Sequence, residues 1–193
     1  MPLTRDPRRP AAARSNGRDP RPARPDRAGI SGATHARFLL VAAAALAADQ
    51  ATKALALTLL EPGWPVAVFA GFNLRLGFNP GASFGMLSEV MASRPLLMAL
   101  LTGALTLLLA GLGLRARAPL ERAGFSLIVG GACGNIVDRL RQGMVTDFLD
   151  FYWQDWHWPT FNGADVAIFL GLVCILLASW RQRRHDKRHP PHG

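Results

Sequence analysis

The sequence predicts an α-helical membrane protein in which four transmembrane helices carry a small extracytoplasmic β-sheet and an aromatic-rich outer loop. Half of its 193 residues are hydrophobic, and they gather into four runs of the length that a helix needs to cross a hydrocarbon core about 30 Å thick. The net charge of +9 comes from the two ends of the chain, since residues 1–36 contribute +5 and residues 181–193 contribute +4. The neutral middle, 37–180, is therefore expected to lie in the membrane.

The first apolar run follows a basic segment, as the core of a cleavable signal peptide does. It is about 24 residues long, lacks a clean small-x-small exit and carries Asp49 and Lys53, so we interpret it as a retained span. The four predicted spans are residues 37–60, 95–114, 119–140 and 162–180.

Lysine and arginine are distributed unequally between the two sides that these spans define. With the N-terminus inside, the inner segments hold sixteen of these residues and the outer segments hold four, and such an excess marks the cytoplasmic side. We therefore expect a disordered basic cytoplasmic tail at 1–36, a four-span domain at 37–180 and a second basic cytoplasmic tail at 181–193. The extracytoplasmic loops are then 61–94 and 141–161.

The basic charge is confined to the tails rather than spread over a folded face with interleaved aromatic side chains, so we expect no nucleic-acid partner. Contact of the tails with anionic membrane lipid is the simpler expectation. Cys133 and Cys174 lie in apolar runs without a partner motif, which argues against a disulfide framework or a zinc site and favours a packing role.

Both outer loops carry patterns of regular structure. Apolar residues alternate with polar residues or glycine over 73–79, which predicts a half-buried strand, and Pro80 and Gly81 end it. A small sheet on the membrane surface accounts for this pattern. In the second loop, five aromatic residues fall within 151–158; they suit an element at the level of the lipid headgroups, or a plain aromatic belt.

Ionisable side chains inside membrane spans are costly and are functional candidates by default. Asp49 and Lys53 lie four residues apart on one helix face, which favours a mutual ion pair, although direct substrate binding stays open. Asn162 and Asp165 have the spacing of a capping box, which fits the sequence as well as a catalytic role for Asp165 does. All of the candidates lie toward the outer side: Asp49, Lys53, Asp138, Arg139, Asp147, Asp150 and Asp165.

Most hydrolytic schemes lack their residues in this chain. A serine-lysine peptidase needs a lysine near an outer serine, and the lysines are Lys53 and Lys187. A thiol enzyme needs a histidine beside one of the cysteines, yet His157 is the sole histidine outside the predicted cytoplasmic parts, and no HExxH motif is present. A carboxyl pair sharing one proton remains, in which the ionised member activates water and the protonated member donates to the carbonyl oxygen.

Five motifs in a fixed order carry a family resemblance. They are DQATK at 49–53, FNPGASF at 78–84, GNIVDR at 134–139, VTDF at 145–148 and FNGAD at 161–165. Over 37–180 the chain resembles the bacterial prolipoprotein (type II) signal peptidases. The resemblance implies a multi-pass aspartic endopeptidase of the inner membrane that works at the extracytoplasmic side. Such an enzyme removes the signal peptide of a prolipoprotein by cutting before the diacylglyceryl-modified cysteine.

The resemblance also implies roles for individual residues. The catalytic pair falls on Asp147 and Asp165, and the partners are the modified prolipoprotein and membrane lipid, with no cofactor or metal expected. Ser83 and Gly163 depart from the usual family residues, which leaves the chemistry alone but alters packing beside the site. The remaining matched positions bind substrate or support the site: Asp49, Lys53, Asn79, Gly81, Asn135, Asp138, Arg139 and Asn162.

Two residues compete as the partner of Asp165. Asp138 ends the third span beside Arg139, whose charge would hold it ionised, so it orients other groups more naturally than it shares a proton. Asp147 comes after Gly143, where the chain can turn back toward the fourth span, so we favour Asp147. In the third span Gly130 and Gly131 allow neighbouring helices to pack closely.

A small transporter or proton-conducting membrane protein is the alternative function, because it would use the same intramembrane carboxylates. It predicts polar residues along a whole path across the membrane, and the second span and the inner halves of the third and fourth spans nearly lack them. A structural membrane scaffold leaves the five motifs unexplained.

Overall fold

The computed structural model describes residues 32–81 and 94–188. Each of the four helices in these ranges coincides with most of one predicted span. The helices are α1 (Gly32–Leu59), α3 (Pro95–Arg115), α4 (Pro119–Gln142) and α5 (Gly163–Arg188), and the strands are β1 (Val66–Phe69), β2 (Phe72–Asn79), β3 (Val145–Trp153) and β4 (Trp156–His157). Ser83 and the end of the FNPGASF motif lie outside the described residues.

Two helices are longer than the spans that the sequence predicts. α1 starts at Gly32, inside the segment expected to be a tail, and α5 continues beyond residue 180 to Arg188. Extending an existing helix needs no new nucleus, and arginine and glutamine are good helix formers. The guanidinium of Arg184 also lies 3.9 Å from the ring centre of Trp180, one turn earlier, which supports the added turns.

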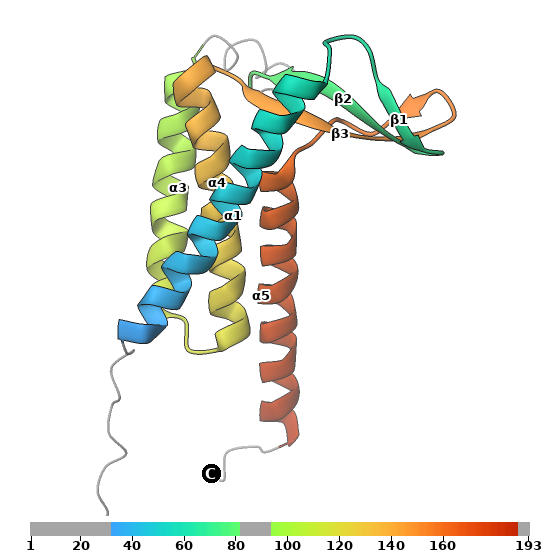
Figure 1. Cartoon of the computed structure of the whole chain (residues 1–193). Helices are drawn as coiled ribbons and strands as arrows, with labels where there is room; N and C mark the ends of the chain where they lie inside the picture. The colour runs from blue at the N-terminus through green and yellow to red at the C-terminus, as the bar shows by residue number, and fades with distance from the viewer. Residues whose placement is uncertain (1–31, 82–93, 189–193) are drawn as a thin grey trace, which may run out of the picture.

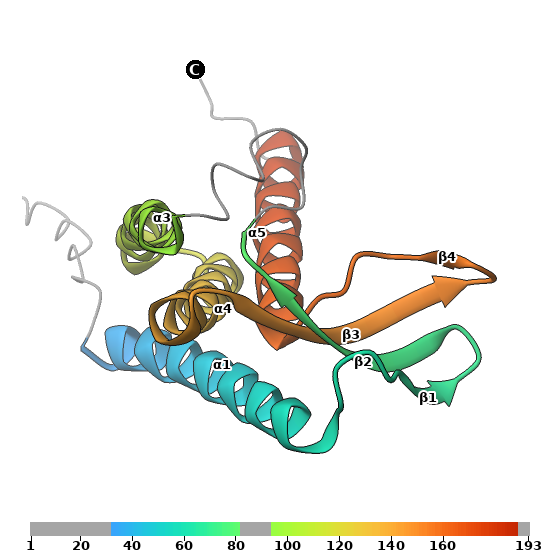
Figure 2. The same cartoon turned by 90° about the horizontal axis from the view of Figure 1, so that it is seen from above.

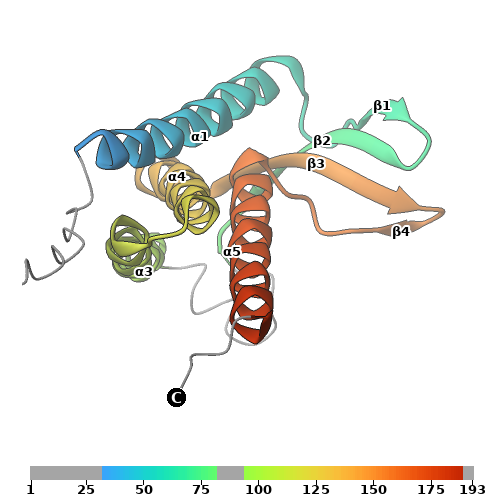
Figure 3. The same cartoon turned by 90° about the horizontal axis from the view of Figure 1, so that it is seen from below.

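Three of the helices have the length and apolar composition of membrane spans: α1, α3 and α5 up to His185. α4 is less apolar because its first turn carries Glu121 and Arg122 and its C-terminal half carries further polar and charged residues. It lies between the other three helices and contacts each of them (Figures 2 and 3). Ser126 and Asp138 of α4 are accordingly buried against protein.

Glycines let α4 approach its neighbours closely. A Cβ atom on Gly124 would lie 2.6 Å from the carbonyl oxygen of Gly171 in α5, and one on Gly131 would lie 2.5 Å from that of Ala164. A Cβ on Gly130 would collide with the carbonyl oxygen of Ala42 in α1. The predicted close packing at Gly130 and Gly131 is thus confirmed, because only glycine fits at these contacts.

The four strands form one antiparallel sheet in the order β1-β2-β3-β4. In the central pair, Asn73 of β2 lies opposite Asp150 of β3, and Gly77 lies opposite Asp147. β2 ends at Asn79, directly before the predicted break. In the segment 141–161, expected to be an aromatic-rich outer loop with regular structure, β3 and β4 are that regular structure.

The sheet projects sideways from the end of the helix bundle where α1 ends and α5 begins (Figure 1). β3 follows α4 through Gly143, whose φ of 77° and N–H bond to the Arg139 carbonyl form a left-handed helix cap. This is the turn that the sequence predicts. Trp153, Trp156 and Trp158 remain more than half exposed, as rings at a membrane interface do.

Candidate active site

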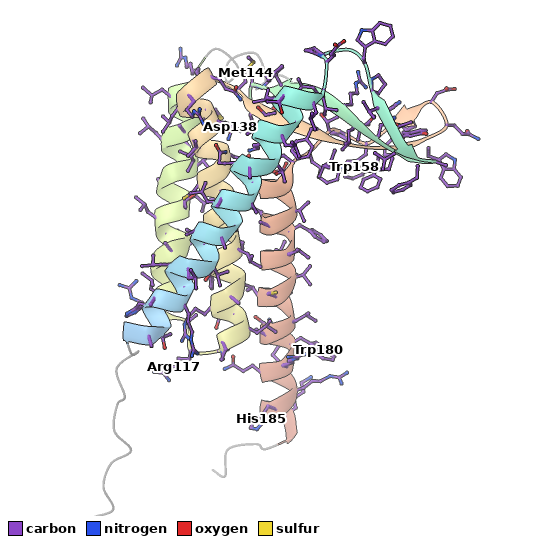
Figure 4. All side chains as sticks on the ribbon, in the orientation of Figure 1. Arg117, Asp138, Met144, Trp158, Trp180 and His185 are labelled. Atoms are coloured by element: carbon purple, nitrogen blue, oxygen red, sulfur yellow. The ribbon has the colours of Figure 1, made fainter. Side chains whose placement is uncertain are left out.

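The polar residues singled out in the sequence meet where α1, α4 and α5 adjoin β2 and β3. Asp138 marks this end of the bundle in Figure 4, and Arg117, Trp180 and His185 mark the opposite end. α1 contributes Asp49 and Lys53, α4 contributes Asn135, Asp138 and Arg139, β2 ends with Asn79, β3 contributes Asp147, and the start of α5 contributes Asn162 and Asp165.

Asn162 and Asp165 begin α5 as a capping box, as the sequence predicts. Asn162 Oδ1 accepts a hydrogen bond from the N–H of Asp165 at 3.1 Å, and Asp165 Oδ2 accepts one from the N–H of Asn162 at 3.2 Å. The cap leaves Asp165 Oδ1 free to accept from Asn135 Nδ2 at 3.3 Å. The positive end of the helix dipole of α5 lies beside this carboxyl group.

Asp147 is a buried carboxyl group with a raised pKa. Only 2% of its surface is exposed, and Asn162 Nδ2 donates to its Oδ1 at 2.6 Å. Burial raises the pKa of Asp147 to about 6, the hydrogen bond from Asn162 opposes this rise, and the negative charge of Asp165 adds to it. A hydrogen bond from Asn79 and the charge of Lys53 also lower the pKa. Asp147 therefore gains or loses its proton at mildly acidic pH.

Two asparagines connect the carboxyl groups of Asp147 and Asp165. Asn162 Nδ2 donates to Asp147 and also to Asn135 Oδ1, at 3.2 Å. Asn135 Oδ1 accepts in addition from Lys53 Nζ at 2.9 Å, and Asn135 Nδ2 reaches Asp165. The two carboxyl groups thus belong to one hydrogen-bond network whose members come from three different helices and a strand.

Lys53 is the centre of a buried ion cluster next to this network. Its Nζ lies 2.9 Å from Asp49 Oδ2 and 3.0 Å from Asp138 Oδ2. The predicted ion pair between Asp49 and Lys53 is confirmed, and a second carboxylate shares the same ammonium. The cation that Asp138 meets is therefore Lys53 rather than its sequence neighbour Arg139.

One ammonium does not balance two buried carboxylates, and three further donors compensate. Gln50 Nε2 donates to Asp138 Oδ1 at 3.0 Å, and the N–H of Thr146 donates to Asp138 Oδ2 at 3.0 Å. The N–H of Ala164 donates to Asp49 Oδ1 at 2.7 Å. Asp49 thereby holds the first turn of α5, and Asp138 holds the start of β3, so the cluster positions the segments that carry the two network carboxyl groups.

The end of β2 forms a turn over the site. Asn79 Oδ1 accepts the N–H of Gly81 at 2.9 Å, and Gly81 has a φ of +102°, which residues with a side chain rarely adopt. A Cβ atom on Gly81 would lie 3.4 Å from Met98 Cγ and 3.7 Å from Arg139 Nη2. The buried Nε of Arg139 has no hydrogen-bond partner among the described residues, so this guanidinium retains a donor for a ligand.

A cavity of about 320 Å³ opens beside Asp147, between the end of β2 and the segment that follows β4. Its lining consists of Gly77, Phe78, Asn79, Pro80, Asp147, Pro159 and Thr160. A second cavity, of about 290 Å³, reaches Lys53 and Asp138 but neither Asp147 nor Asp165. The first cavity is therefore the one that offers a ligand access to a carboxyl group of the network.

Three participants in the site were missed by the sequence reasoning. Gln50 adjoins Asp49 in the first motif and lies three residues before Lys53, a spacing that places it on the same side of the helix. Thr146 and Ala164 act through backbone N–H groups, for which no side-chain signal exists. One candidate does not join the network: Asp150 binds His157 and Asn73 within the sheet.

The arrangement fits acid-base chemistry on a polar bond. Asp147 holds a proton more readily than a free aspartate does, because burial raises its pKa. Two carboxyl groups in one hydrogen-bond network can share a single proton. Such a pair can activate water and protonate a carbonyl oxygen in the same step.

The comparisons with known proteins show the family of this chain. The sequence model of the family described as Signal peptidase (SPase) II matches residues 41–181. The lipoprotein signal peptidase of Hydrogenovibrio crunogenus is 43% identical over 145 residues, which cover 72% of this chain and 83% of that protein. The lipoprotein signal peptidase of Aeromonas hydrophila is 41% identical over 152 residues, which cover 77% and 90%.

Two solved structures described as bacterial membrane enzymes share the fold. One has a TM-score of 0.67 at 25% identity and covers 82% of this chain and 93% of its own. The other has a TM-score of 0.65 at 27% identity and covers 74% and 92%.

Proposed function

Because this chain belongs to the signal peptidase II family, we propose that it removes the signal peptide of bacterial prolipoproteins as an aspartic endopeptidase. The cut falls before the cysteine that carries diacylglycerol. The family match and the lipoprotein signal peptidases of two bacteria support the peptidase activity and the prolipoprotein substrate. The observation that carries the aspartic mechanism is the bridge by Asn162, which donates to Asp147 and exchanges two hydrogen bonds with Asp165.

The catalytic cycle uses one shared proton. In the resting state the shared proton is on Asp147, in line with the raised pKa of this residue, and Asp165 is the base of the pair. Asp165 takes a proton from water as the water oxygen attacks the scissile carbonyl carbon, and Asp147 donates its proton to the carbonyl oxygen. When the tetrahedral intermediate collapses, Asp165 passes its proton to the leaving amine and Asp147 recovers its own from the hydroxyl group.

The other site residues bind the substrate or hold the segments that carry the catalytic pair in position. Arg139 and the turn at Asn79 and Gly81 lie over the carboxyl pair and hold the substrate backbone. Lys53, with its two carboxylates, keeps α5 and β3 in place and does not take part in proton transfer. Asp138 belongs to this second group, since Lys53 and the N–H of Thr146 both contact its Oδ2.

The proposed enzyme crosses the bacterial inner membrane four times, with both termini in the cytoplasm and the site outside. α4 is a membrane span in addition to α1, α3 and α5. Its polar residues are tolerated because the other helices surround it. Arg117, Trp180 and His185 lie at the end of the bundle opposite the site (Figure 4). Arg181, Arg183 and Arg184 fall between Trp180 and His185 in the sequence, and basic residues at this end support the orientation. The gathering of carboxylates at one end of the bundle supports a peptidase rather than a conducting path.

Cleavage by the purified protein tests the function. A precursor peptide with a diacylglyceryl-modified cysteine should be cut, with the modified cysteine as the new N-terminus by mass spectrometry. The same peptide without the lipid should be cut poorly, because it lacks the acyl chains that hold the substrate in the membrane. Each buried CH₂ of such a chain contributes about 0.8 kcal/mol to binding. Equal turnover of both peptides, or a cut elsewhere, would contradict the proposal.

A further inference from the structure

Asp150 and His157 form a polar cluster that the proposed reaction does not use. Both carboxylate oxygens of Asp150 lie close to His157 Nδ1, at 2.9 and 3.0 Å. Asn73 Nδ2 lies 3.4 Å from the same carboxylate, and Tyr152 stacks on the imidazole with ring centres 5.5 Å apart. Asp150 lies three residues after Asp147 along β3, and its hydrogen-bond partners come from β2 and β4.

The burial of Asp150 makes its partner important. The residue is 0% exposed, and the imidazole of His157 is the one basic side chain within salt-bridge distance of it among the described residues. A buried carboxylate that loses its donor must find another or draw in water, which displaces the strands around it. Because the three members of the cluster come from β2, β3 and β4, their hydrogen bonds join three neighbouring strands.

The register of the strand after β4 depends on few backbone bonds. Tyr152 lies opposite His157, and the N–H of Trp158 donates to the Phe151 carbonyl at 2.8 Å. Pro159 has no N–H to continue the ladder, and the next bonds join Phe161 to Leu149, at 2.8 and 3.1 Å.

Between these bonds the segment 158–161 advances three residues while β3 advances two, and the N–H groups of both Phe148 and Leu149 donate to the Phe161 carbonyl, at 3.0 and 2.8 Å, so the pairing contains a bulge. Asn162 follows directly after this bulge. If the segment 158–162 slipped by one residue against β3, its side chains would turn to the other face of the sheet. The amide of Asn162 would then leave Asp147, to which it now donates at 2.6 Å.

We propose that Asp150 and His157 are positioning residues of the peptidase site. Their hydrogen bond lies next to the Phe151–Trp158 pair, the last regular pair before the bulge. It fixes the register of the segment 158–162 against β3 and so brings Asn162 against Asp147 and Asp165. The inference rests on the proposed function, and it assigns a role in that function to a pair of residues outside the hydrogen-bond network of Asp147 and Asp165.

Two variants that differ by one CH₂ group test the role. In His157→Asn the side-chain amide nitrogen takes the place of Nδ1 and can still donate to Asp150, whereas in His157→Gln it reaches the place of Nε2 instead. Both variants lose the aromatic ring equally. We expect His157→Asn to keep kcat within about threefold of the wild type and His157→Gln to lower kcat at least about tenfold, with KM little changed, as misplaced catalytic groups do.

The pH profile separates positioning from a general loss of stability. The hydrogen bond from Asn162 lowers the pKa of Asp147, so its loss in His157→Gln should move the alkaline limb of the rate profile to higher pH. Leu60→Ala is the matched control, because Leu60 packs in a separate cluster with Ala56, Leu76 and Phe148. That variant should lower the melting temperature and leave the pH profile in place.

Amide hydrogen exchange provides a readout that does not depend on activity. The N–H groups of Phe161 and Asn162 should exchange faster in His157→Gln than in His157→Asn. Equal exchange and equal kcat in these two variants would overturn the positioning role. Absence of cleavage by the wild-type chain, with the exchange difference present, would instead count against the peptidase assignment and leave the register role supported.

Discussion

Replacement of Asp147 by asparagine should make the protein inactive and more stable at the same time. The carboxyl group is 2% exposed, and burial is the main reason that its pKa rises from 3.8 to about 6. At pH 8 the folded chain therefore holds a buried negative charge at a cost. Asparagine keeps the shape and an acceptor oxygen for Asn162 but carries no charge.

The size of the effect follows from the pKa. A rise of the pKa from 3.8 to about 6, at about 1.36 kcal/mol for each tenfold change in the acid constant, gives a free energy of unfolding about 3 kcal/mol higher for Asp147→Asn at pH 8. A raised folded pKa means that the native state binds the extra proton, so the wild type loses stability as pH rises from about 4 through 6. At pH 4 the folded carboxyl group is protonated, and the two proteins should differ by less than about 1 kcal/mol.

Unfolding in detergent, followed by tryptophan fluorescence at pH 4, 6 and 8, measures this difference. Asp155→Asn is the matched control, because Asp155 is exposed in the turn between β3 and β4, and it should show no pH-dependent gain. A variant at position 147 that is less stable than the wild type at pH 8 would refute the reasoning. A gain of equal size at pH 4 and pH 8 would refute it as well, because the charge would then not be its cause.

Three further predictions concern the ion cluster, the turn and the topology. Lys53→Met leaves two buried carboxylates without their ammonium and should lower the free energy of unfolding by about 3–5 kcal/mol, measured by thermal unfolding. Gly81→Ala forces a side chain into a left-handed conformation and should cost about 1 kcal/mol or more and lower kcat. In a chain without its native cysteines, a cysteine at Gln154 should react with a membrane-impermeant thiol reagent in intact cells, and one at Gln182 only after lysis; the reverse would invert the proposed orientation.

Local patterns in the sequence predict much of this fold. The helices follow from runs of apolar residues, and the capping box at Asn162 and Asp165 follows from a spacing of three residues. The left-handed cap at Gly143 is likewise a local property of glycine. Each of these features depends on neighbours in the chain, so no knowledge of the tertiary structure is needed.

The contacts between distant segments could not be predicted in this way. The sequence places Asp138 beside Arg139, but the folded chain brings Lys53 of α1 to it across the bundle. In the aromatic-rich second outer loop, β3 is a strand because it pairs with β2, which lies more than sixty residues earlier in the chain. Strand pairing and helix packing decide both outcomes, and neither leaves a mark in the local sequence.

The most direct test of the catalytic pair is the turnover of Asp147→Asn, Asp165→Asn and the double variant on the diacylglyceryl-modified precursor. Groups that act as a unit give non-additive losses, so each single change should lower kcat by at least about 10³-fold and the double change should lower it little further. Asp138→Asn should lose activity only in proportion to its loss of folded protein. If Asp147→Asn retained more than a few per cent of wild-type turnover while well-folded Asp138→Asn had none, the pair would be Asp138 and Asp165, contrary to the mechanism proposed for this site.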